Sequence, residues 1–300
     1  MTPVFYKAIQ VIVAILVLFA LLTGALAVMK QDGLISDPSK NVSTYIIKGW
    51  VDTSGFTDKQ FDTYNQFATN YRKLPHSVNK KGGAQFSYTM WAKFNDLSDE
   101  NVANKVLFMH GDKTNYPYSV AQGQSSKQVS DYIVKCPLIK FGDTADTLEV
   151  HVNTSDDLNT TATIARIPSS DDTMRHNIFS LIPGKWVLLT YTFEDHVAHG
   201  VADGVEFKFY VNDVLYHTET LAGHMRLNQG QFHILPNGSQ IQGGMMADLM
   251  YHNYALGMKD VSRILARGFN NVRYNEMEND PSFNQPLYLS QYNKLEINNN

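Results

Sequence analysis

Cysteine is almost absent from this chain, and that absence excludes two kinds of protein. Among 300 residues there is a single cysteine, Cys136, so an internal disulfide framework and a metal site built on several thiolates are both ruled out. Its flanks, IVKCPLIKF, are rich in β-branched and apolar residues and are typical of a strand. We therefore expect Cys136 to be a buried, unreactive thiol.

An excess of positive charge is also missing. Lys and Arg total 25 against 29 Asp and Glu, which gives a formal net charge of −4, and no basic stripe occurs. Nucleic acid is therefore not an expected partner. The hydrophobic fraction of 43% and the aromatic fraction of 12% suit a globular chain rich in β structure.

One long hydrophobic run lies near the start of the chain. The stretch AIQVIVAILVLFALLTGALAVM, residues 8–29, carries no charge and is bounded by Lys7 and Lys30. As a helix it would be about 33 Å long, enough to cross a bilayer. We therefore expect residues 1–30 to be a single-pass transmembrane anchor, with the lipid bilayer as partner through residues 8–29. The alternative is a cleaved signal peptide, because residues 25–27 read A-L-A. The few flanking lysines leave the orientation open.

Residues 31–83 are expected to form a membrane-proximal linker. STYIIKGWV indicates a first strand. In TDKQFDTYNQFATNYRKLP, the residues Phe61, Tyr64, Ala68 and Tyr71 fall near helical spacing, which predicts a short amphipathic helix that ends before Pro75.

From residue 84 onward the pattern is almost wholly that of strands. In VEFKFYVNDVLYHTE the apolar side chains alternate, and Asn212-Asp213 suit a tight hairpin turn. We expect Phe207, Phe209 and Val211 to be buried between two sheets, with Trp186 close by. Further strands are predicted in AQFSYTMWAKF, NKVLFMHGD, DYIVKCPLIKFGD, DTLEVHVNT, GKWVLLTYTFED, GQFHILPNG and MADLMYHNYAL.

A short C-terminal helix is predicted in MKDVSRILARG. Val261, Ile264 and Leu265 share one face, and Gly268 suits a C-cap. The whole pattern predicts an all-β antiparallel β-sandwich over residues 84–271. The remaining residues, 272–300, are polar with spaced apolar side chains, so we expect a C-terminal arm that lies along a neighbouring surface.

Three successive segments carry a family resemblance. KWVLLTYTFED, then GVEFKFYVNDVLYHTETL, then GGMMADLMYHNYALGMKDVSRIL resemble the laminin-G-like branch of the concanavalin A-like lectin/glucanase superfamily. The resemblance covers about residues 85–269 and implies a concanavalin A-like jelly roll. Asp213 stands where the family usually has a turn glycine. Since this fold hosts lectins, hydrolases and spacers, the resemblance leaves the activity open.

The architecture as a whole also resembles another group of proteins. An N-terminal anchor joined to one such domain, in an Asn-rich chain, is similar to virion proteins of large DNA viruses with an internal membrane. This resemblance implies a minor capsid or virion membrane protein at the interface between internal membrane and capsid, with neighbouring capsid or membrane proteins as partners.

Hydrolysis is not expected. Glucanases of this fold carry carboxylates as E-x-D-x-x-E on one strand face, and this chain has no such run. Glu149 stands alone in LEVHV. Glu194 and Asp195 are adjacent, so they would face opposite sides of a strand. The sequence therefore predicts that the protein is not an enzyme.

No cofactor is expected, although two kinds of metal site were weighed. His196 and His199 could offer nitrogen ligands, but such a pair in a polar loop is commonly solvated. The laminin-G-like resemblance implies calcium at the sandwich rim as an alternative, and the candidate ligands are Asp143, Asp146, Asp156 and Asp157. Aspartate in such loops equally serves the turn itself.

A glycan site would need an exposed aromatic ring beside polar groups. The candidates are Trp50, Tyr116 and Tyr118, whereas Trp91 and Trp186 lie in strands and are expected in the core. The leading hypothesis is a non-catalytic, membrane-anchored structural or interaction protein that links an internal virion membrane to the capsid layer. The alternative is a membrane-anchored lectin that binds glycans.

Overall fold

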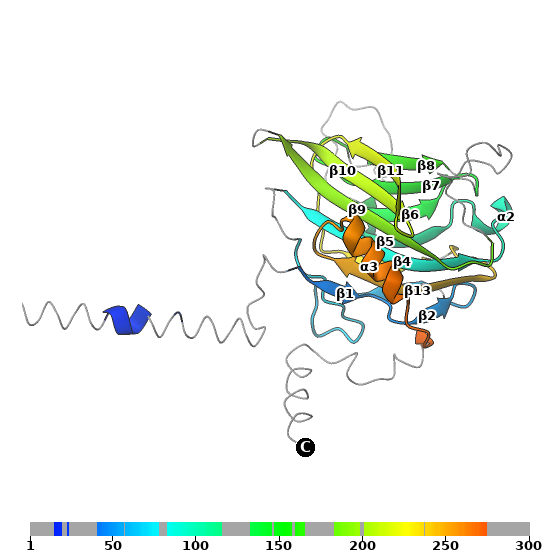
Figure 1. The fold of residues 1–300 in the computed structure, drawn as a ribbon, viewed down its shortest axis with the longest axis horizontal. Helices are drawn as coiled ribbons and strands as arrows, with labels where there is room; N and C mark the ends of the chain where they lie inside the picture. Colours follow the sequence, from blue (N-terminus) through cyan, green and yellow to red (C-terminus); the bar gives the residue numbers. More distant parts are fainter. Residues whose placement is uncertain are drawn as a thin grey trace, which may run out of the picture. The chain divides into compact units, whose positions relative to one another are not determined.

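The computed structural model of the chain describes residues 15–19, 23, 41–56, 58–77, 83–115, 133–145, 147–157, 160–165, 183–198, 201–236 and 238–274. The chain divides into two compact units, residues 1–40 with 287–300, and residues 41–286. The second unit holds all of the described strands, which form two antiparallel sheets (Figure 1). The predicted antiparallel β-sandwich is therefore confirmed.

The first unit is described only at residues 15–19 and 23, which are helical. The hydroxyl of Thr23 donates to the carbonyl oxygen of Phe19 at 3.0 Å, as is common within one helical turn. Most of the expected anchor, residues 8–29, lies outside the described residues. Among those that are described, no helix is both long enough and apolar enough to cross a membrane.

Sheet A has seven strands. Its order is β1-β13-β4-β9-β10-β11, and β2 also pairs with β13. The strands are β1 (Ser43–Tyr45), β2 (Trp50–Asp52), β4 (Gln85–Phe94), β9 (Val187–Ala198), β10 (Val201–Val211), β11 (Val214–Leu221) and β13 (Gly244–His252).

Sheet B has six strands in the order β3-β12-β5-β6-β7-β8. They are β3 (Lys59–Phe61), β5 (Val106–Asn115), β6 (Ile133–Phe141), β7 (Thr147–Val152), β8 (Thr160–Ala165) and β12 (Gln231–Ile234). Strand β8 was not predicted from the sequence, because TTATIA places only Ala162 and Ile164 on its inward face, too few apolar residues to mark a strand.

The main core lies between the two sheets, as the period-2 pattern requires. The hairpin of β10 and β11 turns at Asn212, whose φ of 54° is the left-handed geometry expected there. Phe207 and Phe209 are fully buried in this core, while Val211 is half-buried at its margin. The predicted register of the hairpin is thus confirmed.

A second apolar cluster lies outside sheet A, under helix α3 (Met258–Arg267). Figure 1 shows this helix lying across the sheet. Gly268, with φ of 71°, ends the helix as predicted, and its N–H donates to Leu265 O at 3.1 Å. Val261 packs here against Trp91 and other side chains of the sheet. Helix α2 (Asp99–Val102) is a single turn.

The two tryptophans expected in the core belong to this outer cluster. Trp91 is buried beneath α3, and the ring centroid of Trp186 lies 4.4 Å from that of Phe269. Trp186 therefore does not accompany Phe207 between the sheets. Strand alternation explains the difference at Trp91, because its neighbours Met90 and Ala92 take the inward positions.

The segment before residue 84 contributes strands to both sheets. STYIIKGWV forms β1 and β2 rather than one strand, and β3 follows. The amphipathic helix expected around residues 61–71 is wrong, since Phe61 ends β3 and turns follow it. Phe61 faces the core at 1% exposure because it pairs with Phe232 of β12, a partner that helical spacing could not reveal.

The start of the expected C-terminal arm also packs on the sandwich. Tyr274 is fully buried, and its ring meets that of Phe56 edge to face at 5.8 Å. Val272 O accepts a hydrogen bond from Trp50 N at 2.9 Å, and Arg273 forms a parallel bridge with Trp50. The rest of the arm lies outside the described residues.

Candidate functional site

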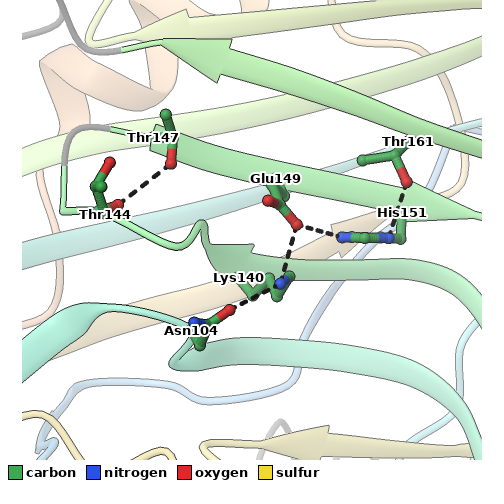
Figure 2. Close-up of polar contacts among 7 residues, drawn as sticks. All are labelled: Asn104, Lys140, Thr144, Thr147, Glu149, His151 and Thr161. Carbon is green, nitrogen blue, oxygen red and sulfur yellow. Dashed lines mark hydrogen bonds and ion pairs between the residues drawn. The ribbon is translucent and has the colours of Figure 1, made fainter.

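The outer face of sheet B carries a chain of polar side chains. In β7, Leu148, Val150 and Val152 point inward, so Glu149 and His151 must point outward. Antiparallel pairing places Lys140 of β6 directly opposite Glu149 and Thr161 of β8 opposite His151. Figure 2 shows these four side chains converging from three neighbouring strands. We call them the sheet B network.

The network is continuous. Glu149 Oε2 lies 3.0 Å from Lys140 Nζ and 2.8 Å from His151 Nε2. The other ring nitrogen, Nδ1, lies 3.0 Å from the Thr161 hydroxyl. At the opposite end, Lys140 Nζ donates to Asn104 Oδ1 at 3.2 Å. Each distance is within hydrogen-bonding range.

Glu149 is held in its ionised form. Partial burial would raise its pKa, but hydrogen bonds from Lys140 and His151, together with the charge of Lys140, bring it below the ordinary value. A general acid for hydrolysis needs the opposite, a raised pKa. Its cross-strand neighbours are Lys140 and Thr163 rather than a second acid. Glu149 is therefore arranged as a hydrogen-bond acceptor and not as half of a hydrolytic pair.

His151 is neutral at pH 7. Burial lowers its pKa, the hydrogen bond from its ring to Glu149 opposes that effect, and the charge on Lys135 lowers the pKa further. Since a carboxylate only accepts, the imidazole proton belongs on Nε2, and Nδ1 accepts from Thr161. The network thus fixes one tautomer and orients the ring.

Lys135 lies on the neighbouring strand and adds to the positive side of this face. It is 6% exposed, and burial together with the charge of Lys140 lowers its pKa to about 8. The charge of Asp157 opposes part of this shift, so both lysines, Lys135 and Lys140, have a carboxylate nearby.

The acids adjacent in the sequence do separate as expected. Asp195 turns inward, is 6% exposed and accepts hydrogen bonds from Ala84 N at 2.8 Å and Met225 N at 3.2 Å. Glu194 faces the other way, where Gln85 donates to it at 3.2 Å. Asp195 therefore ties strand ends together, and the two carboxylates do not face one cleft.

The candidate calcium ligands are not brought together. Asp143 is exposed in the turn between β6 and β7, and Asp146 lies outside the described residues. Asp156 accepts from its neighbour Ser155 at 2.9 Å, and Asp157 N donates to Thr154 Oγ1 at 3.1 Å, so both serve a local turn. His196 is exposed, and His199 is not described. Within the described ranges no three His, Cys, Asp or Glu side chains form a metal-binding group.

Of the three candidate glycan residues, Trp50 alone lies among the described residues. Trp50 is half-buried, and the guanidinium of Arg273 lies 5.5 Å from its ring centroid, so this ring face is already covered. Tyr116 and Tyr118 lie outside the described residues. Trp50 is thus a packing residue at the edge of sheet A.

Cys136 matches its prediction. It is 2% exposed in the core between the sheets, and burial, with a smaller contribution from Asp195, raises the pKa of its thiol to about 12. The thiol therefore stays protonated and unreactive at neutral pH.

Sequence reasoning missed Lys140, His151 and Thr161 as partners of Glu149. One signal was present, because Glu149 and His151 are two residues apart on a strand and must share a face. Lys140 and Thr161 gave no such signal, since they come from other strands and only the pairing register places them there.

Comparisons with known proteins identify no family. No family model matches the chain, and no curated protein matches it. Among solved structures, the receptor-binding domain of botulinum neurotoxin D is 11% identical, with 76% of this chain and 48% of that chain covered at a TM-score of 0.45. The corresponding values for the botulinum neurotoxin C/D mosaic receptor-binding domain are 12%, 76%, 46% and 0.41. For the binding domain of botulinum neurotoxin DC in complex with SialylT they are 13%, 61%, 36% and 0.39.

This chain spans less than half the length of each of these three structures. The low TM-scores carry no argument about its function, and the sandwich is established by its own strand pairing.

Proposed function

We propose that the protein is a non-catalytic interaction module, tethered to a bilayer by residues 8–29, that links this membrane to a neighbouring protein layer. The observation that supports the tether is the helical turn at residues 15–19. Its five successive side chains, Ile15 to Phe19, are 53% to 69% exposed. Large apolar side chains exposed on every side of a helix require an apolar environment.

The setting proposed for this module is a virion with an internal membrane, where it would join the membrane to the capsid as a minor capsid protein. The support is the chain's organisation, an apolar segment followed by one sandwich whose buried acids, such as Asp195 and Asp248, tie backbone segments together.

Membrane extraction tests the tether. The full chain should resist alkaline carbonate extraction and float with vesicles, whereas a chain lacking residues 1–29 should stay in the soluble fraction. A mature protein that begins at Val28 would identify the segment as a signal peptide and overturn the tether. Fractionation of purified particles tests the setting, since the protein should then remain with capsid proteins after the membrane is dissolved.

A second candidate function is glycan binding, and the sheet B network favours it. The ammonium group of Lys140 uses two of its three N–H donors on Glu149 and Asn104, so the third can donate to a sugar hydroxyl. The test is a glycan array probed with the detergent-solubilised full chain and with Lys140→Ala. A matched control is Lys208→Ala, which removes a lysine ion-paired at 2.7 Å with Glu206 in sheet A. Binding lost only in Lys140→Ala supports the lectin; no saccharide bound by the unchanged chain argues against it.

A further inference from the structure

The turn region after β3 displays two aromatic side chains to solvent. Tyr64 is 71% exposed and Phe67 is 77% exposed, the two highest values among the large hydrophobic residues that the structure describes in residues 41–286. From Thr63 to Tyr71 the chain reads TYNQFATNY and carries no charge. We call residues 62–72 the aromatic loop.

The aromatic loop is held rigid by its own hydrogen bonds. Asp62 Oδ1 accepts from Tyr64 N at 2.9 Å and from Asn65 N at 2.6 Å. Asn65 Oδ1 in turn accepts from Phe67 N at 3.1 Å. The loop closes where Arg72 N donates to Asp62 O at 2.8 Å. The turn chemistry of Asp and Asn therefore fixes the backbone that presents both rings.

The base of the loop is fixed to the sandwich. Arg72 is 6% exposed, and its guanidinium lies 4.8 Å from the ring centroid of Phe61. It also donates to the hydroxyl of Tyr274 at 3.3 Å. Because the base packs on the sandwich and hydrogen bonds define the turns, the loop presents Tyr64 and Phe67 away from the core. Such rigidly displayed apolar side chains mark a contact surface.

The loop shares an edge of the sandwich with the strand where the chain enters the sandwich unit. β11 and β8 end the two sheets and contact each other at one edge. β1 and β3 end the same sheets at the opposite edge, and the aromatic loop follows β3 directly. Residues 30–42 can extend to at most about 45 Å. A bilayer that holds residues 8–29 would therefore lie within about that distance of the start of β1.

The composition of the loop favours a lipid surface over a glycan. Aromatic side chains flanked by uncharged polar residues are preferred at the interface between headgroups and acyl chains. A sugar site would need free polar groups beside the rings. Here the acceptors of Asp62 and Asn65 hold the turns, and Asn70 Nδ2 donates to Gln60 O at 2.8 Å.

We propose that the aromatic loop is a second membrane contact, in which Tyr64 and Phe67 insert into the interfacial region of the bilayer and orient the sandwich against it. This inference rests on the proposed tether. The anchor supplies attachment and the loop supplies orientation, since two separated contacts fix a plane where a single flexible one does not.

The test uses the full chain reconstituted in phosphatidylcholine vesicles. Because Cys136 is buried and unreactive, a thiol introduced by Gln66→Cys can be labelled selectively with an environment-sensitive fluorophore. The matched site is Asp213→Cys, which is exposed at the turn between β10 and β11. Quenching by lipids with brominated acyl chains should be at least about twofold stronger at position 66, as expected for burial at the interface.

A paired set of variants ties the effect to the rings. In the Gln66→Cys chain, Tyr64→Ser with Phe67→Ser should abolish the excess quenching. Val214→Ser with Leu215→Ser, which removes another exposed apolar pair at 50% and 40%, should leave it unchanged.

The experiment distinguishes a wrong loop contact from a wrong tether and from a wrong ligand. A chain that floats with vesicles while the label at position 66 stays in water overturns the loop contact alone. A chain that does not float overturns the tether and, with it, this contact. A fluorophore at position 66 that brominated lipid does not quench, but whose emission changes with a soluble saccharide or a capsid protein, overturns the lipid assignment in favour of that ligand.

Discussion

The outer face of sheet A and the outer face of sheet B differ in what lies over their central strands. On sheet A, helix α3 buries Trp91, Leu188 and Ala247 in an apolar cluster. On sheet B, the corresponding positions of β6 and β7 carry Lys140, Glu149 and His151, which bind one another. One face is thus closed by packing and the other is stabilised by polar pairing.

The two histidines on these faces report the same difference. His252 of sheet A is 2% exposed and accepts or shares hydrogen bonds with Ser43 at 2.7 Å and Thr89 at 3.1 Å. Burial, with the charge of Arg267, lowers its pKa to about 3. His151 of sheet B has a carboxylate partner that opposes the same effect. Burial therefore opposes protonation of the histidine on the closed face, whereas on the open face the Glu149 carboxylate offsets part of that effect.

The largest loss of unfolding free energy is expected for a substitution between the sheets, and the effects on the two outer faces are compared with it. Phe209→Ala empties a fully buried site and should lower the free energy of unfolding by about 3–5 kcal/mol. Urea denaturation of the full chain in detergent, followed by near-ultraviolet circular dichroism, measures it. A loss below about 1 kcal/mol would mean that the strand register is wrong.

The closed face should respond almost as strongly. Leu188 is fully buried under α3, so Leu188→Ala should cost about 2–5 kcal/mol, somewhat less than Phe209→Ala because fewer atoms are removed. The control is Thr163→Ala on the exposed face of β8, which should change stability by no more than about 0.5 kcal/mol. Equal effects at the two sites would erase the distinction between the faces.

The two histidines should contribute differently to the loss of stability at low pH. The pKa of His252 falls from 6.5 in the unfolded chain to about 3 in the native state. Below pH 6.5 the unfolded state therefore binds a proton that the native state does not, and stability is lost as pH falls. This histidine alone should contribute about 1.4 kcal/mol per pH unit between pH 6 and 4. His110, whose pKa burial lowers to about 4, adds a similar slope.

The measurement is urea unfolding at several pH values in that window. His252→Asn should reduce the slope by about one proton, whereas His151→Asn on the open face should reduce it less. The reverse order would show that the network on sheet B, rather than the closed face, carries the acid sensitivity.

The smallest effect is expected from the sheet B network. Glu149→Gln should cost about 0.2–1 kcal/mol, as for partly exposed ion pairs. It removes the carboxylate charge that raises the pKa of His151, so that pKa should fall further. Titration of the imidazole resonances by NMR checks the direction, and a rise would contradict the geometry. The isosteric Gln retains the shape of the side chain and isolates the loss of charge.

The spacing of apolar residues along the chain predicted individual strands and the C-terminal helix. Phe207 and Phe209 alternate along one strand, and Val261, Ile264 and Leu265 share one helical face, so both elements could be recognised before their partners were known. The helix expected around Phe61 is not present. The spacing of the few apolar residues there is compatible with a helix or a strand, and Phe61 pairs with Phe232 of β12 as part of a strand.

The candidate sites were decided by local contacts in one case and by a distant contact in the other. Asp156 accepts a hydrogen bond from Ser155, and the N–H of Asp157 donates to Thr154, in a local turn of the kind that aspartate commonly serves. Trp50 offered an aromatic ring, but Arg273 from the far end of the chain covers it. That second contact leaves no trace in the immediate sequence.

The sequence by itself determined the uncharged segment at residues 8–29, the strand alternation from residue 84 and the isolation of Cys136, because each depends on neighbouring residues or on composition. The tertiary structure alone decided that a helix covers the outer face of sheet A and which side chains contact Glu149. It also decided that Tyr274 is buried while Tyr64 and Phe67 are exposed. Those outcomes follow from strand order and register. Both are set by the packing of the whole domain, since a shift of one residue in a single strand would exchange its inner and outer faces.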